Sequence, residues 1–174
     1  KHIDREETVV EMYTHVGYFQ QLMNFMGFNE GLLALYEEPE ECMALFEYLA
    51  DFYNMVAKKT IEYYKSDIML INDDIATAIN PFISVQMYRE MIKPFAARLG
   101  NIGREAGLYI DMHCCGRCED FIDDWLDFGV SMWNPAQVMN DLKGIKEKYG
   151  NKLTLIGCWD SSGPPSWPGA GEEL

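Results

Sequence analysis

The chain has 174 residues, of which 48% are hydrophobic, and its formal net charge at pH 7 is -14. A chain of this length and hydrophobic content can bury a sizeable core, which excludes a disordered polymer. A surface this acidic repels phosphate backbones and anionic lipids, so we expect neither nucleic acid nor a membrane as a partner. No stretch reaches the roughly 20 apolar residues of a membrane span, and five cysteines do not resemble a secreted disulfide framework, so we expect a cytoplasmic protein.

Short apolar segments alternate with longer amphipathic segments along the chain. Strands are predicted at residues 8–17, 66–74, 108–113, 130–135 and 152–160. Helices are predicted at residues 39–64, 84–107, 118–129 and 140–149, and the second of them is interrupted near Pro94, because proline lacks the amide proton that a helix interior needs. The helix that begins at Pro39 has its predicted apolar face at Leu45, Leu49, Phe52, Val56 and Tyr63, which recur at spacings of three, four or seven.

Polar or reactive residues follow most of the predicted strands. These residues are Asp73, Asp74, His113, Cys115, Asn134, Gln137, Cys158 and Asp160. Strands that alternate with helices favour a parallel α/β sheet, and the carboxyl ends of such strands line the functional face of a (β/α)8 TIM barrel. A doubly wound sheet uses its strand ends in a similar way, so this pattern alone leaves both folds open.

The segment LYIDMHCCGRCEDF holds one of the three histidines and three of the five cysteines. Side chains alternate across a strand, so Asp111, His113 and Cys115 share one face and Cys114 points to the other. His113 and Cys115 are therefore a feasible pair of zinc ligands, and Asp111 is placed to orient the imidazole of His113. Two other interpretations stay open at this point: a redox pair of Cys115 and Cys118, and plain packing of buried cysteines.

Four segments of the chain resemble the uroporphyrinogen decarboxylase superfamily. They are PFISVQMYREMIKPFAARL, GLYIDMHCCG, FGVSMWNPAQ and LKGIKEKYGNKLTLIGCWD, in this order along the chain. The resemblance runs from about Gly17 to Asp160 and implies a (β/α)8 barrel of roughly twice this length. We therefore expect residues 1–174 to form a single domain that is a central portion of such a barrel, with barrel strands missing at both ends. Since half a barrel would expose large apolar edges, we do not expect this segment to fold stably alone.

The resemblance implies two main chemistries. One is decarboxylation of uroporphyrinogen without a cofactor, and the other is zinc-dependent methyl transfer between a corrinoid (methylcobamide) protein and a thiol such as coenzyme M. The methyltransferases carry an H-x-C pair at this strand end, which His113 and Cys115 match. We therefore expect a methyltransferase with zinc as its metal and a corrinoid protein as its partner. The third zinc ligand of the methyltransferases is a cysteine far downstream, which is expected beyond Leu174, and Cys158 is the alternative within this sequence.

The resemblance and the strand-end positions together suggest roles for five further residues. Asp74 and Asp111 are the expected catalytic carboxylates: Asp74 binds the substrate or a ligand, and Asp111 tunes His113. Substrate-binding residues are expected at Asn134, Gln137 and Asp160, each of which follows or ends a predicted strand.

Two alternatives to methyl transfer remain open from the sequence. A uroporphyrinogen decarboxylase or a related carboxy-lyase would show no dependence on a metal. A non-catalytic partner of a corrinoid protein would keep its interaction, with no turnover lost, when His113 and Cys115 are replaced. A transferase would lose turnover and keep the interaction.

Overall fold

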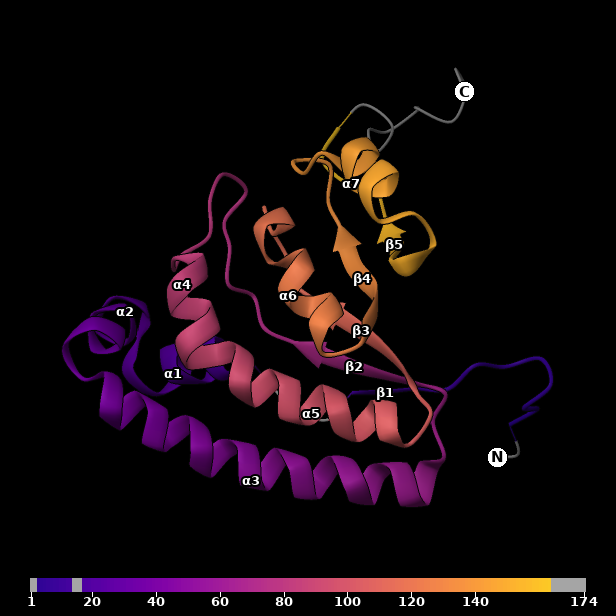
Figure 1. Cartoon of the computed structure of the whole chain (residues 1–174), viewed down its shortest axis with the longest axis horizontal. Coiled ribbons are helices and arrows are strands. Elements are labelled where there is room, and N and C mark those ends of the chain that lie inside the picture. Colours follow the sequence, from indigo (N-terminus) through magenta and orange to yellow (C-terminus); the bar gives the residue numbers. More distant parts are fainter. Residues whose placement is uncertain (1–2, 14–16, 164–174) are drawn as a thin grey trace.

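Five parallel strands form one sheet in the computed structural model, which describes residues 3–13 and 17–163 (Figure 1). The strands are β1 (Glu11–Tyr13), β2 (Ile68–Asn72), β3 (Tyr109–His113), β4 (Val130–Ala136) and β5 (Thr154–Gly157). Each strand from β2 onward pairs in parallel with the strand that precedes it in the sequence, so the sheet order is β1-β2-β3-β4-β5.

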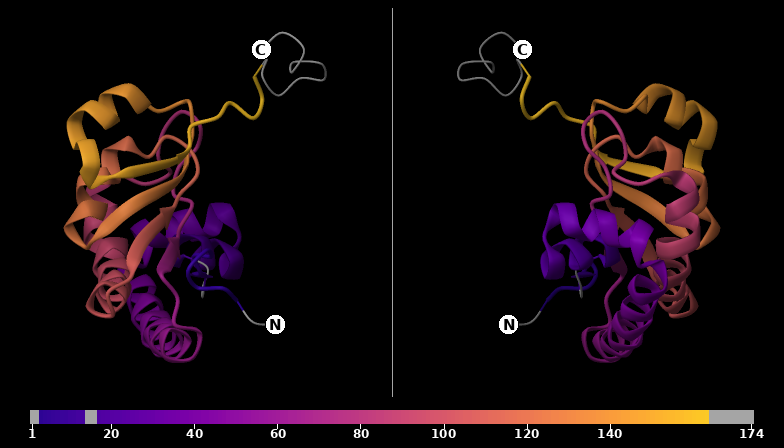
Figure 2. Two further views of the ribbon diagram at one scale, coloured as in Figure 1. Left: turned by 90° about the vertical axis from the view of Figure 1, so that its right-hand side faces the viewer. Right: turned by 90° about the vertical axis from the view of Figure 1, so that its left-hand side faces the viewer.

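Helices connect consecutive strands. They are α1 (Tyr18–Met26), α2 (Phe28–Glu37), α3 (Pro39–Tyr64), α4 (Val85–Met87), α5 (Lys93–Glu105), α6 (Ile122–Asp127) and α7 (Leu142–Tyr149). A π-helical turn, Tyr88–Ile92, joins α4 to α5, and 3-10 turns occupy Glu119–Phe121 and Gly150–Lys152. Figure 2 shows α5, α6 and α7 on one side of the sheet, and α3 runs beside α5 (Figure 1).

The order of the strands decides between the two folds that the sequence leaves open. A doubly wound sheet reverses its strand order at a switch point and carries helices on both faces. Here the sheet grows in one direction, strand after strand, as in a (β/α)8 barrel. The predicted fold class is therefore confirmed: the chain has an α/β fold and forms a portion of a (β/α)8 TIM barrel.

The predicted strands and helices after residue 66 are found within a few residues of their expected bounds. The interruption near Pro94 is confirmed, because the π-helical turn ends at Ile92, directly before the turn that contains the proline. Helices α1 and α2 were not predicted. Strand β1 is shorter than the predicted 8–17, and residues 14–16 of that range lie outside the described residues. Within the described ranges, no helix is long and apolar enough to cross a membrane.

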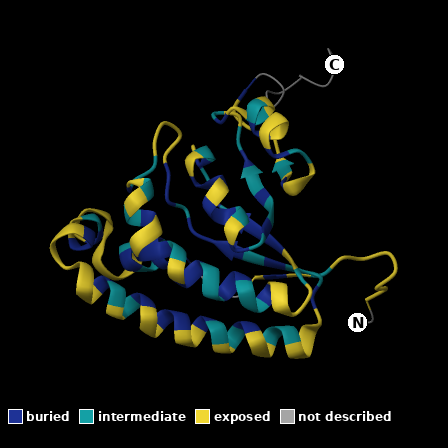
Figure 3. Ribbon diagram, in the orientation of Figure 1, coloured by how far each residue is buried: buried dark blue, intermediate teal, exposed yellow. Residues whose placement is uncertain are grey.

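Helix α3 begins at Pro39 as predicted, and its predicted apolar face is confirmed in part: Leu49 is buried, and Leu45 and Val56 are half-buried. The buried residues are Cys42, Phe46, Leu49, Ala50, Tyr53 and Ala57. Phe52 and Tyr63, which the spacing places on the apolar face, are 53% and 73% exposed. The helix packs against α5 and α1, where the rings of Tyr53 and Tyr18 lie 5.6 Å apart, so these neighbours select the stripe that is buried (Figure 3).

Aromatic side chains fill the space between α6 and the sheet. The ring of Trp125 on α6 lies 5.7 Å from that of Trp133 on β4 and 6.3 Å from that of Phe121. The indole nitrogen of Trp133 donates a hydrogen bond of 3.1 Å to the carbonyl oxygen of Cys114. The core thus holds the backbone in place just after the end of β3.

Asp124 on α6 ties that helix to the α4–α5 segment. Its carboxylate is buried and accepts hydrogen bonds from Arg89 (2.9 Å) and Lys93 (2.8 Å). Burial alone would raise the pKa of Asp124, but the hydrogen bonds from Arg89 and Lys93 outweigh it, and the pKa is lowered. The ionised form is therefore the one that the fold stabilises.

We expect Asp124→Asn to lower the free energy of unfolding at pH 7 by about 1.5–3 kcal/mol, the usual contribution of a hydrogen bond to a charged group. Because the folded-state pKa lies below the unfolded one, this contribution is present at neutral pH and is lost as pH falls through the folded pKa. Urea unfolding at pH 7 and at about pH 3 measures the difference. The exposed Asp120→Asn is the matched control, and an equal effect of both variants would contradict the expectation.

Candidate metal centre

The carboxyl ends of β2, β3 and β4 bring polar side chains to one level. The strand register pairs His113 with Asn72 on β2 and with Asn134 on β4. Along β3 the predicted alternation is confirmed, because Ile110 and Met112 are buried on the helix side while His113 is half-buried on the other face. Three neighbouring strands therefore present an imidazole and two amides side by side.

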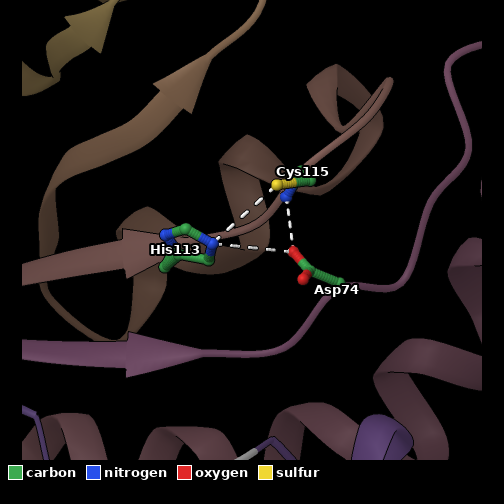
Figure 4. Close-up of side chains that lie close together, drawn as sticks. All are labelled: Asp74, His113 and Cys115. Carbon is green, nitrogen blue, oxygen red and sulfur yellow. Dashed lines mark hydrogen bonds and ion pairs between the residues drawn. The ribbon is translucent and has the colours of Figure 1, made fainter.

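Three side chains converge at this edge of the sheet (Figure 4). The Nε2 atom of His113 lies 3.8 Å from Sγ of Cys115 and 3.9 Å from Oδ1 of Asp74. Asp74 follows β2, His113 ends β3, and Cys115 lies two residues beyond it. Among the described residues, these three form the one group of histidine, cysteine or acidic side chains whose ligand atoms all lie within 4.8 Å of one another.

The donor set fits a zinc ion. A tetrahedral zinc with bonds of about 2.0–2.3 Å holds its ligand atoms roughly 3.3–3.8 Å apart. The two distances from Nε2 of His113 lie at or just beyond this range. Nitrogen, thiolate and carboxylate oxygen are the zinc ligands found in proteins, and three of them leave a fourth position for a substrate. His113, Cys115 and Asp74 are therefore the residues that could hold the metal.

The other ring nitrogen of His113 is engaged by β4. Its Nδ1 atom lies 2.7 Å from Oδ1 of Asn134, and Nδ2 of the same amide donates to Oδ2 of Asp111. The sequence suggests that Asp111 orients His113 directly, but the structure places Asn134 between them. The reason is geometric: Asp111 and His113 are successive residues on one face of one strand, whereas Asn134 stands opposite His113 on the next.

Asp74 is held from two sides. Its Oδ1 accepts a hydrogen bond of 2.7 Å from the amide of Cys115, and its Oδ2 accepts one of 3.0 Å from Nε2 of Gln20 on α1. The side-chain oxygen of Gln20 in turn accepts a 2.6 Å hydrogen bond from Asn72. Gln20 is a site residue that the sequence reasoning missed, since no local pattern marks a polar residue in the first turn of an unpredicted helix.

The preceding residue, Asp73, has a different task. It is buried, and its carboxylate accepts hydrogen bonds from the amides of Phe19 (2.9 Å) and Gln20 (3.0 Å) at the start of α1. Burial raises the pKa of Asp73 to about 7, although these two hydrogen bonds act in the opposite direction. A Cβ on Gly17 would lie 2.2 Å from Asn72 O and from Asp73, so only glycine allows this approach. Asp73 thus fixes α1, and α1 delivers Gln20 to Asp74.

Two groups of the centre have shifted pKa values. Burial, together with the charge and hydrogen bonding of Asp74, raises the pKa of the Cys115 thiol to about 11. Burial also raises the pKa of Asp111 to about 6, so it is mostly ionised at neutral pH. Without a cation the centre therefore keeps Cys115 as a thiol, and a bound divalent cation would favour the thiolate instead.

The loop after β3 is held by the loop after β4. Oε1 of Gln137 accepts a 2.7 Å hydrogen bond from the amide of Gly116, and Oδ1 of Asn140 accepts one from the amide of Cys118. Gln137 therefore lies beside the centre, where its side chain supports the loop. The thiol of Cys118 lies 3.2 Å from that of Cys114, and both are buried, so the nearest sulfur partner of Cys118 is Cys114 rather than Cys115.

The structure does not bring the predicted residues after β5 into the group of three. Cys158 is exposed, and its φ of 57° follows Gly157 at 99°, so the backbone leaves the extended conformation at the end of β5. Asp160 accepts a 3.0 Å hydrogen bond from the amide of Ser162 in its own turn. Of the eight predicted site residues, Asp74, His113 and Cys115 form the group of ligand atoms. Hydrogen bonds place Asp111, Asn134 and Gln137 beside that group, and no such contact with it is found for Cys158 or Asp160 among the described residues.

The family profile described as Uroporphyrinogen decarboxylase (URO-D) matches residues 15–162. The chain belongs to the uroporphyrinogen decarboxylase family. A solved structure of a methyltransferase from Methanosarcina mazei is similar to the chain, with a TM-score of 0.60 and 17% sequence identity. The similarity covers 81% of this chain and 40% of that one, so the chain spans less than half of its length. A comparison with curated protein sequences finds no match.

These comparisons confirm the superfamily that the sequence segments indicate. At 17% identity, the methyltransferase of M. mazei supports the fold of this chain. The range of this chain that the family profile matches includes all three residues of the centre. It also includes Gln20 and Asn134 beside them. Family and fold together indicate an enzyme, whereas the reaction that it catalyses depends on the residues of the site.

Proposed function

We propose that the protein is a zinc-dependent methyltransferase that moves a methyl group between a corrinoid (methylcobamide) protein and a thiol or similar acceptor. One observation supports this proposal above the others: Asp74, His113 and Cys115 offer three ligand atoms that all lie within 4.8 Å of one another at the carboxyl ends of β2 and β3. This edge is the functional face of a (β/α)8 barrel. The similarity to a methyltransferase from M. mazei agrees with it.

The residues of the chain have distinct tasks in this proposal. His113 offers Nε2, Cys115 offers Sγ, and Asp74 offers Oδ1. Gln20 and Asn134 hold Asp74 and His113 in these positions through hydrogen bonds of 3.0 Å and 2.7 Å. When bound, zinc would hold the thiol substrate and favour its deprotonated form, which is the nucleophile in methyl transfer.

Asp74 offers the third candidate ligand within the described part of the chain, whereas the cysteine expected beyond Leu174 stays a prediction. Its Oδ1 belongs to the group of three, whereas Cys158 is exposed and outside it. A site of His, Cys and Asp carries the same formal charge of -2 as one of His and two Cys when the thiols are ionised. We therefore propose Asp74 as the third ligand within the described part of the chain, with no role for Cys158.

The family description favours one second candidate, uroporphyrinogen decarboxylation. Its substrate is a polycarboxylate, which needs positively charged side chains around the site. The carboxylates described at this strand edge, Asp74 and Asp111, are instead acidic. Arg117, in the loop after β3, is paired with Glu119 at 2.9 Å. The charge of the site thus favours a cationic metal over an anionic substrate.

The proposal is tested on one anaerobic preparation of the protein by metal analysis and by a methyl-transfer assay with methylcobalamin and coenzyme M. We expect about one zinc per chain and demethylation of methylcobalamin that a chelator stops and added zinc restores. Metal-independent consumption of uroporphyrinogen would instead support the decarboxylase. Binding of a corrinoid protein without any turnover would support the non-catalytic partner.

A further inference from the structure

We infer that Asn134 is a positioning residue that leaves Nε2 of His113 free to bind a metal, and that Asp111 sets the orientation of Asn134. The three side chains form a relay that runs from Asp111 through the Asn134 amide to Nδ1 of His113. The inference deepens the proposed function and rests on it for the identity of the metal. The relay itself is a property of the metal-free protein.

The first step is the orientation of the Asn134 amide. Asp111 on β3 is 2% exposed, and its Oδ2 is hydrogen-bonded to Nδ2 of Asn134. A carboxylate can only accept hydrogen bonds, whereas an amide has one donating and one accepting end. Asn134 therefore turns its NH2 group to Asp111. An asparagine with no charged neighbour could turn either end toward a histidine.

The second step is the tautomer of His113. With its NH2 group committed to Asp111, Asn134 presents Oδ1 to Nδ1 of His113 at 2.7 Å. Since an amide oxygen only accepts, Nδ1 must carry the ring proton. The lone pair of the neutral imidazole then lies on Nε2, the atom 3.8 Å from Sγ of Cys115 and 3.9 Å from Oδ1 of Asp74.

The third step is the competing arrangement that the relay prevents. Asp74 Oδ1 would readily accept a hydrogen bond from a protonated Nε2, because the two atoms are already 3.9 Å apart. In that tautomer Nε2 of His113 carries the proton and therefore offers no lone pair to a metal. Partners that fix the tautomer of a ligating histidine typically change metal affinity by about 10–100-fold. The relay therefore acts on affinity through His113, without touching the metal.

The tautomer is measured directly by ¹⁵N NMR of the histidine side chains in the metal-free protein at alkaline pH, with His113→Gln to assign the signal. We expect the wild type to hold the proton on Nδ1. We expect Asn134→Leu to shift the population toward Nε2–H and to weaken zinc binding by about 10–100-fold. Met132→Leu, on the same strand, is the control and is expected to leave both quantities unchanged.

A double substitution provides the rescue. Asp111→Asn combined with Asn134→Asp reverses the direction of the first hydrogen bond but still presents an acceptor to Nδ1 of His113. We expect it to restore the Nδ1–H tautomer and zinc affinity to the wild-type value or above. The nearly isosteric single variant Asp111→Asn removes the fixed acceptor, so both tautomers are expected in it.

The outcomes separate the relay from the metal. A wild-type His113 with its proton on Nε2, or an Asn134→Leu variant with unchanged tautomer and zinc affinity, would overturn the relay even if the protein binds zinc and transfers methyl groups. An Nδ1–H tautomer that depends on Asn134 in a protein that binds no zinc would support the relay and reject the proposed metal.

Discussion

For the proposed zinc-dependent methyltransferase, replacing Cys115 with serine is expected to abolish both zinc binding and methyl transfer. Removing a residue that hydrogen-bonds a zinc ligand typically lowers zinc affinity by about 10–100-fold. Removing a ligand itself is therefore expected to lower zinc affinity by more than about 100-fold. A serine hydroxyl does not ionise near neutral pH and cannot replace a thiolate. Metal analysis after dialysis and zinc titration with a chromophoric competitor give the stoichiometry and the affinity.

Cys158→Ser is the matched control for this experiment, because it makes the same chemical change at an exposed cysteine outside the group of three. We expect zinc content and turnover in Cys158→Ser to equal those of the wild type. The reverse result, with zinc lost from Cys158→Ser and kept in Cys115→Ser, would contradict the assignment of the centre. It would also return Cys158 to the role that the sequence left open for it.

Replacing Gly116 with alanine is expected to destabilise the protein strongly. Gly116 has a φ of +94°, and a Cβ there would lie 2.5 Å from the carbonyl oxygen of Thr77 and 2.7 Å from that of Ala76. A left-handed conformation costs an L-residue about 1–2 kcal/mol, and overpacking costs about 1–3 kcal/mol. We therefore expect the free energy of unfolding to fall by about 2–5 kcal/mol.

Gly107→Ala isolates the effect of the contact from the effect of the backbone. Gly107 has a similar φ of +80°, but nothing lies within 4 Å of a Cβ built on it. In Gly107→Ala we therefore expect the free energy of unfolding to fall only by the cost of the left-handed backbone, about 1–2 kcal/mol. Urea unfolding of both variants measures the difference. Equal losses would show that the loops after β2 and β3 are not packed as the structure has them.

Much of the fold follows from local pattern, and the missing parts depend on distant residues. β2 is an apolar run that ends in a polar residue, and β3 alternates the apolar Ile110 and Met112 with polar residues; a single window of sequence reveals both patterns. Helix α1 has no capping side chain of its own, and the amides of its first turn are satisfied by Asp73, more than 50 residues farther along the chain. The buried stripe of α3 is likewise set by its neighbours, so Phe52 faces outward despite its spacing.

The candidate site likewise has features that local sequence predicts and features that depend on distant residues. Alternation along β3 predicts that His113 and Cys115 share a face, and strand-end positions identify Asp74 and Asn134 as polar neighbours. Their individual partners could not be predicted, because they depend on the register between strands: Asn134 stands opposite His113 and therefore separates it from Asp111. The positive φ angles at the end of β5, which redirect the chain before Asp160, leave no comparable signal in a single sequence.

The sequential order of the sheet has a consequence for how the protein is made. Each strand from β2 to β5 pairs with a strand translated before it, so that edge is already present when the strand leaves the ribosome. β/α units can then add one at a time from the amino-terminal side, because β2, β3, β4 and β5 each find one partner strand already synthesised. The centre is completed in the same order: Gln20 first, then Asp74, then His113 and Cys115, and last Asn134. A nascent chain would thus acquire the three proposed metal ligands before Asn134, the residue that we infer sets the tautomer of His113.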